Sequence, residues 1–190
     1  MRDDDALGVI VCGASAAVSL PAYLSRLRRV LPRTAIRVLL TASAERFVRP
    51  EVVGWYADEC LTGDTDGLNP TEFAARSRGI TVLPASANTL ACAALGLAGT
   101  PAQTALLVAT PPVLFFPSMN RVMWARSSVG RHVTELRAEG HTVVDPSPGE
   151  AYEIWQRRIV PSVIMPGPDL AVEVITTWWE ELTTHDEGTA

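Results

Sequence analysis

Three short segments of small and hydroxyl-bearing residues each follow an apolar run that is typical of a buried strand. They are Gly13-Ala14-Ser15, Thr41-Ala42-Ser43 and the longer segment 84–89, which reads PASANT. Small residues let a phosphate approach the backbone N–H groups at the start of a helix, and serine or threonine adds further donors. Each segment alone is typical of an ordinary helix N-cap. Together, the three favour a nucleotide-binding site.

Several other kinds of site are excluded by residue types and spacing. Neither G-x-G-x-x-G nor G-x-x-x-x-G-K-[ST] occurs, so a dinucleotide site or a Walker-type phosphate site lacks its usual sequence support. Lysine is absent and all 16 basic residues are arginine, which excludes a Schiff-base lysine. Cys12, Cys60 and Cys92 are scattered, without a C-x-x-C pair or a Cys/His cluster. We therefore expect no metal site.

The elements that must position these segments alternate between short apolar strands and amphipathic helices, as in β-α units around a parallel sheet. Strands are expected at residues 8–12, 36–40, 80–83, 105–109, 113–116 and 142–144. Helices are expected at residues 20–31, 45–48, 71–76, 89–97, 120–126, 129–139 and 168–182, and a further short one after Pro50. The predicted fold is a three-layer α/β structure with helices on both faces of a parallel sheet. Its ligand would bind beyond the carboxyl ends of the strands.

Length and composition fit one domain over residues 1–190, with 47% hydrophobic residues to build a core. The net charge is −5 and no segment is rich in arginine, so we expect no nucleic-acid partner. The start, MRDDD, is acidic where an export signal is basic. The longest apolar stretch, 105–116, is interrupted by two prolines, whereas a membrane helix needs roughly 18 apolar residues. We expect a cytoplasmic protein without a membrane partner.

One segment near the C-terminal end lacks periodicity. Residues 145–168 contain five prolines and two glycines. Long segments of this kind are often lids or binding loops, so a flap that clamps the substrate is predicted at about residues 145–167.

A second motif makes the interpretation more specific. Residues 117–124 read P-x-M-N-x-x-M-W, and they follow the PASANT segment and the G-A-S strand end in this order. The combination is similar to the homo-oligomeric flavin-containing cysteine decarboxylases. That family includes phosphopantothenoylcysteine decarboxylase and the peptidyl-cysteine decarboxylases of lanthipeptide biosynthesis, of the epidermin type. The resemblance extends from about Gly8 to Met165.

The resemblance implies a flavodoxin-like (Rossmann-like) fold that binds FMN. It also implies homotrimers that commonly assemble into a dodecamer, with the flavin site between neighbouring subunits. The residues implied in cofactor binding lie at the strand ends, in the PASANT segment and at one aromatic position: Gly13, Ala14, Ser15, Thr41, Ser43, Phe47, Pro84, Ala85, Ser86, Ala87, Asn88 and Thr89.

The implied reaction is an oxidative decarboxylation of the C-terminal cysteine of a ribosomal precursor peptide. The cysteine is dehydrogenated to a thioaldehyde with hydride transfer to the flavin, and carbon dioxide then leaves to give an enethiol that cyclises to an aminovinyl-cysteine type ring. Asn120 is implied to hold the substrate carboxylate, with Met119 and Met123 beside the substrate. A neutral donor suits this role, because strong stabilisation of the carboxylate would oppose its loss.

One departure from the family pattern concerns the base. Family members usually have a histidine shortly before the PASANT strand, but this sequence has Asn69-Pro70-Thr71-Glu72 there. Either Asn69 or Glu72 substitutes for it, or deprotonation is left to water or the flavin. A thiol with a pKa near 8.5 is already a few per cent ionised at neutral pH. The histidines present, at 132, 141 and 185, are expected to have surface roles.

The flap separates the two branches of the family. The phosphopantothenoylcysteine enzymes carry a flap cysteine that acts as an acid, and residues 145–165 contain no cysteine. This favours a peptide substrate, with Tyr152 and Trp155 in its binding wall or, alternatively, in a subunit interface. Two other functions stay open: a decarboxylase of coenzyme A synthesis, and a catalytically inactive flavin-binding regulatory subunit.

Overall fold

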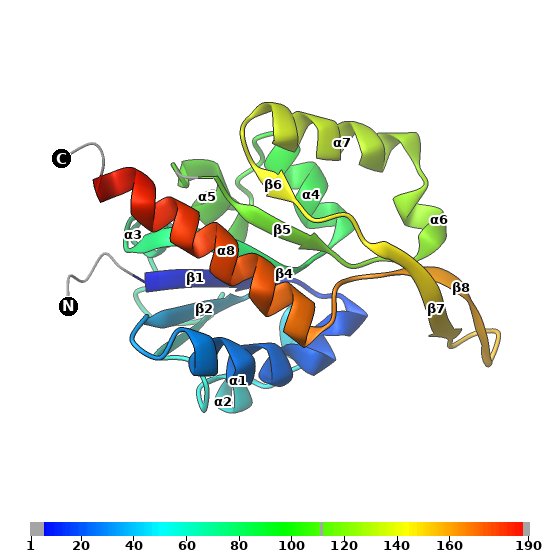
Figure 1. The fold of residues 1–190 in the computed structure, drawn as a ribbon, viewed down its shortest axis with the longest axis horizontal. Helices are drawn as coiled ribbons and strands as arrows, with labels where there is room; N and C mark the ends of the chain where they lie inside the picture. The colour runs from blue at the N-terminus through cyan, green and yellow to red at the C-terminus, as the bar shows by residue number, and fades with distance from the viewer. Residues whose placement is uncertain (1–5, 111, 188–190) are drawn as a thin grey trace.

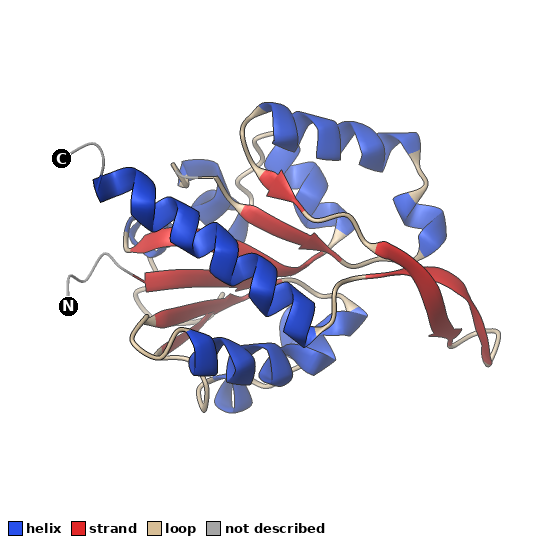
Figure 2. Cartoon of the chain, viewed as in Figure 1, coloured by secondary structure: helices blue, strands red, loops and turns tan. Residues whose placement is uncertain are grey.

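A six-stranded parallel sheet forms the centre of the protein, whose computed structural model describes residues 6–110 and 112–187. In chain order the strands are β1 (Ala6–Val11), β2 (Ile36–Leu40), β3 (Glu59–Thr62), β4 (Ser77–Ala85), β5 (Leu114–Pro117) and β6 (Thr142–Val143). They lie side by side in the order β3-β2-β1-β4-β5-β6, and every neighbouring pair is parallel (Figure 2).

Helices connect the strands and cover both faces of the sheet (Figure 1). They are η1 (Ser15–Ser19), α1 (Leu20–Val30), η2 (Ala44–Arg46), α2 (Pro50–Val53), α3 (Pro70–Ala75), α4 (Ala87–Ala94), α5 (Pro101–Val108), α6 (Arg121–Trp124), α7 (Ser127–Ala138) and α8 (Pro168–Glu187). Helices α1 and α8 pack on one face, and α3, α4, α5 and α7 on the other. The predicted three-layer α/β fold is confirmed.

Strand β1 explains why the sheet is covered on both faces. All six of its residues are buried. Leu7 and Val9 point into the core under α1 and α8, whereas Ile10 points into the core under α4 and α5. A strand with apolar side chains on both sides is stable only between two layers of helices, as in parallel sheets.

The strand order places a crevice at one edge of the sheet. The order 3-2-1-4-5-6 is that of a Rossmann-type sheet, in which the chain leaves the central strand in opposite directions before and after β4. The switch point lies between β1 and β4, and ligands bind there, outside the carboxyl ends of the strands. The segments that follow β1 and β4 are Gly13-Ala14-Ser15 and residues 86–89.

The segment predicted as a flap without regular structure contains a β-hairpin, which corrects that part of the prediction. Strands β7 (Ser147–Glu153) and β8 (Arg158–Ile164) pair antiparallel, with Tyr152 opposite Ile159. The hairpin projects from the body of the molecule beside α6 (Figure 1). Arg157 in its turn has a φ of 52°, the left-handed conformation that closes many tight turns.

Three further assignments from the sequence need correction. Residues 105–109, predicted as a strand, belong mostly to α5. Strand β3 was not predicted. Residues 142–144 do contain a strand, but β7 and β8 follow it. Within the described residues, no helix is long and apolar enough to span a membrane.

Candidate functional site

A cavity of about 450 Å³ opens at the carboxyl ends of β1, β2 and β4. Its lining comes from four short stretches and two single residues: Cys12 and Gly13, residues 39–43, residues 86–89, residues 100–103, Gly63 and Met123. Protein sites for cofactors of moderate size have volumes of about 300–1,000 Å³. The cavity therefore coincides with the ligand position that the strand order predicts.

Close contacts between the ends of β1 and β2 shape one wall. The backbone N–H and the side-chain hydroxyl of Thr41 both donate to the carbonyl of Val11, each at 3.0 Å. A Cβ at Gly13 would lie 2.4 Å from the Cβ of Ser43, closer than two such atoms approach each other. Only glycine at position 13 lets the two strand-end loops meet at this wall.

The beginnings of α4 and α5 form the opposite wall. Ser86 is the N-cap of α4 and accepts from the backbone N–H of Thr89 at 3.2 Å. Thr100 caps α5 in the same way through the N–H of Gln103, at 3.3 Å. The first N–H groups of a helix have no partner within it, and the helix dipole makes this end attractive to negative charge. Two helix starts therefore line one cavity.

The cavity lining is uncharged over the described residues. Its polar side chains are hydroxyls and amides, and none of the described residues that line it is an aspartate, glutamate, histidine or arginine. Burial raises the pKa of the Cys12 thiol, although its hydrogen bonds with Thr89 and with the Ser86 backbone oppose this effect. The thiol therefore stays neutral at physiological pH.

Asn120, predicted to hold the substrate carboxylate, is the exposed N-cap of α6. Its side-chain oxygen accepts from the N–H of Met123 at 2.9 Å. Within the described part of the chain, the Asn120 side-chain NH2 group has no hydrogen-bond partner. Met123 lines the cavity, and Met119 is partly buried against the core under α4 and α5. The motif thus places the Met123 thioether in the cavity lining, whereas Asn120, with its amide donor, lies three residues earlier and outside the lining.

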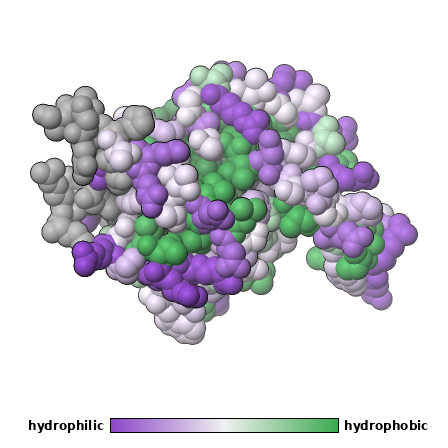
Figure 3. Space-filling view, viewed as in Figure 1, coloured by the Kyte–Doolittle hydropathy of each residue, from purple (hydrophilic) through white to green (hydrophobic). Residues whose placement is uncertain are grey.

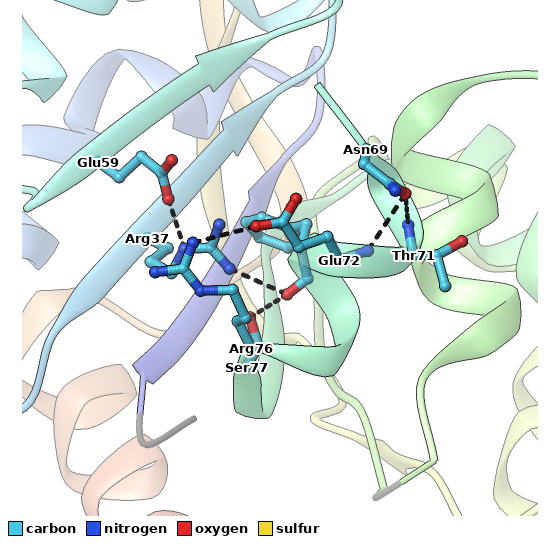
Figure 4. Close-up of polar contacts among 8 residues, drawn as sticks. Arg37, Glu59, Asn69, Thr71, Glu72, Arg76 and Ser77 are labelled. Carbon is cyan, nitrogen blue, oxygen red and sulfur yellow. Dashed lines mark hydrogen bonds and ion pairs between the residues drawn. The ribbon is translucent and has the colours of Figure 1, made fainter. Parts of the chain in front are cut away.

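Asn69 and Glu72, the predicted replacements for a histidine, lie at the first turn of α3 and do not line the cavity. Asn69 caps the helix by accepting from the backbone N–H groups of Thr71 and Glu72, at 3.0 and 3.3 Å. Figure 4 shows the Glu72 side chain directed away from Asn69 and toward Arg76, with which it forms an ion pair at 3.1 Å. The Glu72 carboxylate is therefore already engaged.

Side chains from the neighbouring strands hold α3 in place through Phe73. Arg37 of β2 forms an ion pair with Glu59 and donates to the carbonyl of Phe73 at 3.3 Å, and Ser77 donates to the same carbonyl at 2.7 Å (Figure 4). The Arg37 guanidinium also lies 5.2 Å from the centre of the Phe73 ring. These contacts hold α3, and with it Asn69, in one position on the sheet.

A protein-family model described as Flavoprotein matches residues 1–160. The chain belongs to the flavoprotein family.

Similar proteins extend the match over nearly the whole chain. Mersacidin decarboxylase of Bacillus sp. (strain HIL-Y85/54728) is 29% identical over 185 residues, which cover 96% of this chain and 94% of that protein. The structure of the FMN-dependent cysteine decarboxylase SpaF is 27% identical, covers 94% of this chain and 97% of that one, and has a TM-score of 0.78. The bifunctional coenzyme A biosynthesis protein CoaBC of Bacillus subtilis (strain 168) is 32% identical over 123 residues, 60% of this chain and 30% of that protein.

The cavity of this flavoprotein-family member fits FMN in its donor chemistry. A phosphate suits the helix starts and the neutral hydroxyls, because backbone N–H groups and a helix dipole bind anions without a basic side chain. Met123, whose side chain is exposed at the cavity, offers apolar contact to a ring system.

Most residues implied in cofactor binding are brought together. Gly13, Thr41, Ser43, Ser86, Ala87, Asn88 and Thr89 all line the cavity. Ala14, Ser15, Phe47, Pro84 and Ala85 do not. The carbonyls of Pro84 and Ala85 instead accept from Cys12 and Ser118, which ties β4 to its neighbours. Phe47 is exposed at the end of η2.

Gly63, Thr100 and Gln103 also line the cavity and were missed in the sequence. A signal for Thr100 existed: a threonine followed by a proline is a common helix start. A strand at residues 105–109 is incompatible with a helix that begins at Thr100, whereas the structure has α5 there.

Two sets of predicted residues lie outside the cavity of this chain. Tyr152 and Trp155 are 58% and 79% exposed on the hairpin. His132 is partly exposed on α7, and the side chain of His185 lies outside the described residues. The surface role expected for His141 is wrong, because its Nδ1 accepts from the backbone N–H of Val113 at 3.0 Å.

Proposed function

We propose that this protein is an FMN-dependent peptidyl-cysteine decarboxylase. The observation that carries the proposal is a similarity to mersacidin decarboxylase over 96% of the chain, which includes both the cavity and the hairpin. The similarity to CoaBC covers only 60% of the chain, and the hairpin contains no cysteine. Both facts favour a peptide over the small thiol of coenzyme A synthesis.

The proposed substrate is a ribosomal precursor peptide that ends in cysteine. Its C-terminal residue, –NH–CH(CH2SH)–COOH, loses carbon dioxide and two hydrogens to become –NH–CH=CH–SH. The enethiol then cyclises to an aminovinyl-cysteine type ring of a lanthipeptide-like product. FMN, when bound, supplies the two-electron oxidation that removes the two hydrogens.

The chain's own residues bind and orient the reactants. The hydroxyls of Ser43 and Ser86 and the starts of α4 and α5 would hold the cofactor's polar groups. The free NH2 group of Asn120 would donate to the substrate carboxylate and fix its orientation. An amide is a weaker partner for a carboxylate than a guanidinium, so it does not oppose loss of carbon dioxide strongly.

Deprotonation of the substrate thiol is left to solvent in this proposal. Glu72 is paired with Arg76, and the Asn69 oxygen is occupied by two backbone N–H groups. An unperturbed thiol has a pKa near 8.5, so a few per cent is ionised at pH 7 without any base. The expected rate therefore rises with pH toward the pKa of the substrate thiol.

The hairpin serves as the flap of a single-domain enzyme and binds the peptide. Tyr152, Ile154 and Trp155 are exposed there, and Figure 3 shows hydrophobic residues on the hairpin between hydrophilic ones. A projecting hairpin with exposed aromatic residues is typical of a binding surface.

We also propose that the enzyme forms homotrimers in the cytoplasm, and dodecamers of four trimers. Exposed apolar residues elsewhere, such as Val18 and Leu95, support an assembly in which neighbouring subunits complete the site.

Mass spectrometry tests the proposed function. The protein, loaded with FMN, is incubated with a peptide library that ends in cysteine, together with phosphopantothenoylcysteine. We expect loss of carbon dioxide and two hydrogens from peptides only. Turnover of the small thiol alone would assign the protein to coenzyme A synthesis. Bound FMN without turnover of either substrate would favour a regulatory flavin-binding protein.

A further inference from the structure

Three polar side chains form a chain of contacts at the floor of the cavity. The Sγ of Cys12 lies 3.0 Å from the Oγ1 of Thr89, and this oxygen lies 3.0 Å from the Oγ of Ser86. Cys12 is 1% exposed and Thr89 is buried, whereas Ser86 is partly exposed at the cavity. The chain of contacts therefore leads from the core of the sheet to the ligand space.

The donors and acceptors of these three side chains favour one direction of hydrogen-bond donation. The Ser86 oxygen already accepts from the backbone N–H of Thr89. Thr89 has a single hydroxyl hydrogen for two neighbours, Ser86 and Cys12. Oxygen accepts hydrogen bonds better than sulfur does, and a thiol is a weak donor that here has one side-chain oxygen in reach. The best arrangement runs from the thiol to Thr89 and from Thr89 to Ser86.

In that arrangement both lone pairs of the Ser86 oxygen are occupied, and its own hydrogen points to whatever fills the cavity. If the thiol did not donate to Thr89, the Ser86 hydroxyl could turn inward and donate to Thr89 instead. Ser86 would then present a lone pair to the cavity. The buried thiol thus decides whether Ser86 offers a donor or an acceptor.

We infer that Cys12 is a positioning residue for the cofactor: by donating to Thr89, it commits the Ser86 hydroxyl to donate a hydrogen bond to an acceptor atom of FMN. The inference rests on the proposed function, since FMN is the ligand. Phosphate oxygens, ring carbonyls and the unprotonated ring nitrogens of oxidised FMN are all acceptors, so a donor at Ser86 matches the cofactor. Cys12 itself takes no part in the chemistry, because burial keeps its thiol neutral.

The test is a double-mutant cycle on FMN binding, measured by quenching of flavin fluorescence. The variants are Cys12→Ala, Ser86→Ala and the double variant, with Cys12→Ser to restore a donor. Cys60→Ala is the matched control, because Cys60 lies in β3 and its sulfur does not line the cavity. We expect Cys12→Ala to weaken FMN binding about three- to tenfold, the usual effect of one hydrogen bond. Cys12→Ser should recover part of the loss.

The coupling between the Cys12 and Ser86 substitutions decides the outcome of the cycle. If Cys12 acts through Ser86, Cys12→Ala adds little further loss to Ser86→Ala. Equal losses in both backgrounds, or wild-type affinity in Cys12→Ala, would overturn the inference. If Cys12→Ala does not fold, Thr89→Val interrupts the same chain of contacts and Thr89→Ser preserves it. Failure of the wild-type protein to bind FMN would overturn the proposed function as well, whereas normal binding and turnover with an uncoupled Cys12 would overturn the inference alone.

Discussion

The side-chain oxygen of Asn120 accepts a hydrogen bond from the backbone N–H of Met123, and Met123 lines the cofactor cavity. One asparagine therefore starts the short helix α6 and fixes where the methionine lies. The cap uses only the amide oxygen, so the NH2 group is left for a ligand. The spacing of the P-x-M-N-x-x-M-W motif follows from this geometry, because an N-cap bonds the N–H three residues later.

Asn120 has two roles, as the cap of α6 and as a donor to the substrate. A single substitution can therefore change catalysis while it leaves folding intact. Asn120→Asp keeps an oxygen for the cap, and aspartate is as good an N-cap as asparagine. It also replaces the donor by a negative charge that repels the substrate carboxylate. We expect unchanged thermal unfolding and FMN binding, with kcat/KM lower by about a hundredfold, as for loss of a hydrogen bond to a charged group plus a like-charge contact.

Asn120→Ala is the companion variant. It loses the cap as well, so thermal unfolding should reveal a further cost of about 1 kcal/mol or less. Retained decarboxylation in either variant would contradict the assignment of Asn120 to the substrate carboxylate.

The elements that sequence patterns predicted well are those that are apolar over their full length. Residues 36–40 form β2 as predicted, and all five are buried. Strand β3 was missed because its Glu59 and Thr62 make it look like a loop at the edge of the sheet. The apolar run of residues 105–109 is compatible with a strand and with a buried helix, and periodicity over five residues does not distinguish the two. The hairpin was missed because Pro148 and Pro161 are unusual in strands, although both positions are tolerated on exposed edges.

The site was predictable where it depends on residue type and unpredictable where it depends on packing. Gly13 after β1 and the small hydroxyl residues after β2 and β4 line the cavity, whereas Ser15 after β1 does not. The engagement of Glu72 with Arg76 joins residues four apart on one helix, so it is compatible with the helix predicted at residues 71–76. The chain from Cys12 to Ser86 depends on side-chain positions across separate elements and does not follow from spacing along the sequence.

Asn69→Ala and Asn69→His together test how the enzyme works without a histidine. Both variants lose the cap of α3, which costs about 1 kcal/mol of stability. Only the histidine variant gains a group with a pKa near 6.5. We expect Asn69→His to decarboxylate faster than Asn69→Ala at pH 7, with a pH–rate profile that rises at lower pH. Equal profiles of kcat/KM would mean that position 69 does not reach the substrate thiol.

Glu72→Gln addresses the remaining candidate for a base. The ion pair with Arg76 is exposed and joins residues four apart on a helix, so its loss should cost less than about 0.5 kcal/mol. With solvent as the base, the rate and its pH dependence should be those of the wild type. A large fall in kcat at unchanged KM would identify Glu72 as the base instead.

Trp155→Ala tests the hairpin as a peptide-binding flap. The side chain is 79% exposed, so its removal should leave stability and FMN binding unchanged. We expect KM for the peptide to rise about tenfold or more, as for a truncated aromatic anchor of an interface. Trp55→Ala is the matched control, since Trp55 is 75% exposed and lies after α2, away from the hairpin. A normal KM in Trp155→Ala with an altered oligomeric state would place the tryptophan in a subunit interface.

His141 predicts how stability responds to pH. Its Nδ1 accepts from the N–H of Val113 and its side chain is 16% exposed, so folding requires the neutral ring. Burial lowers the pKa of His141 below its usual value of 6.5, and the nearby Glu139 carboxylate opposes this only in part. Between the folded and unfolded pKa values the unfolded chain binds more protons. The contribution of His141 is therefore fully present above about pH 7 and is lost as the pH falls below 6.5.

His141→Asn keeps an oxygen acceptor for Val113 but cannot take up a proton in this range. Thermal unfolding between pH 5 and pH 8 should show the wild type losing stability toward low pH faster than the variant. Parallel curves for the two proteins would mean that protonation of His141 leaves its bond to Val113 intact.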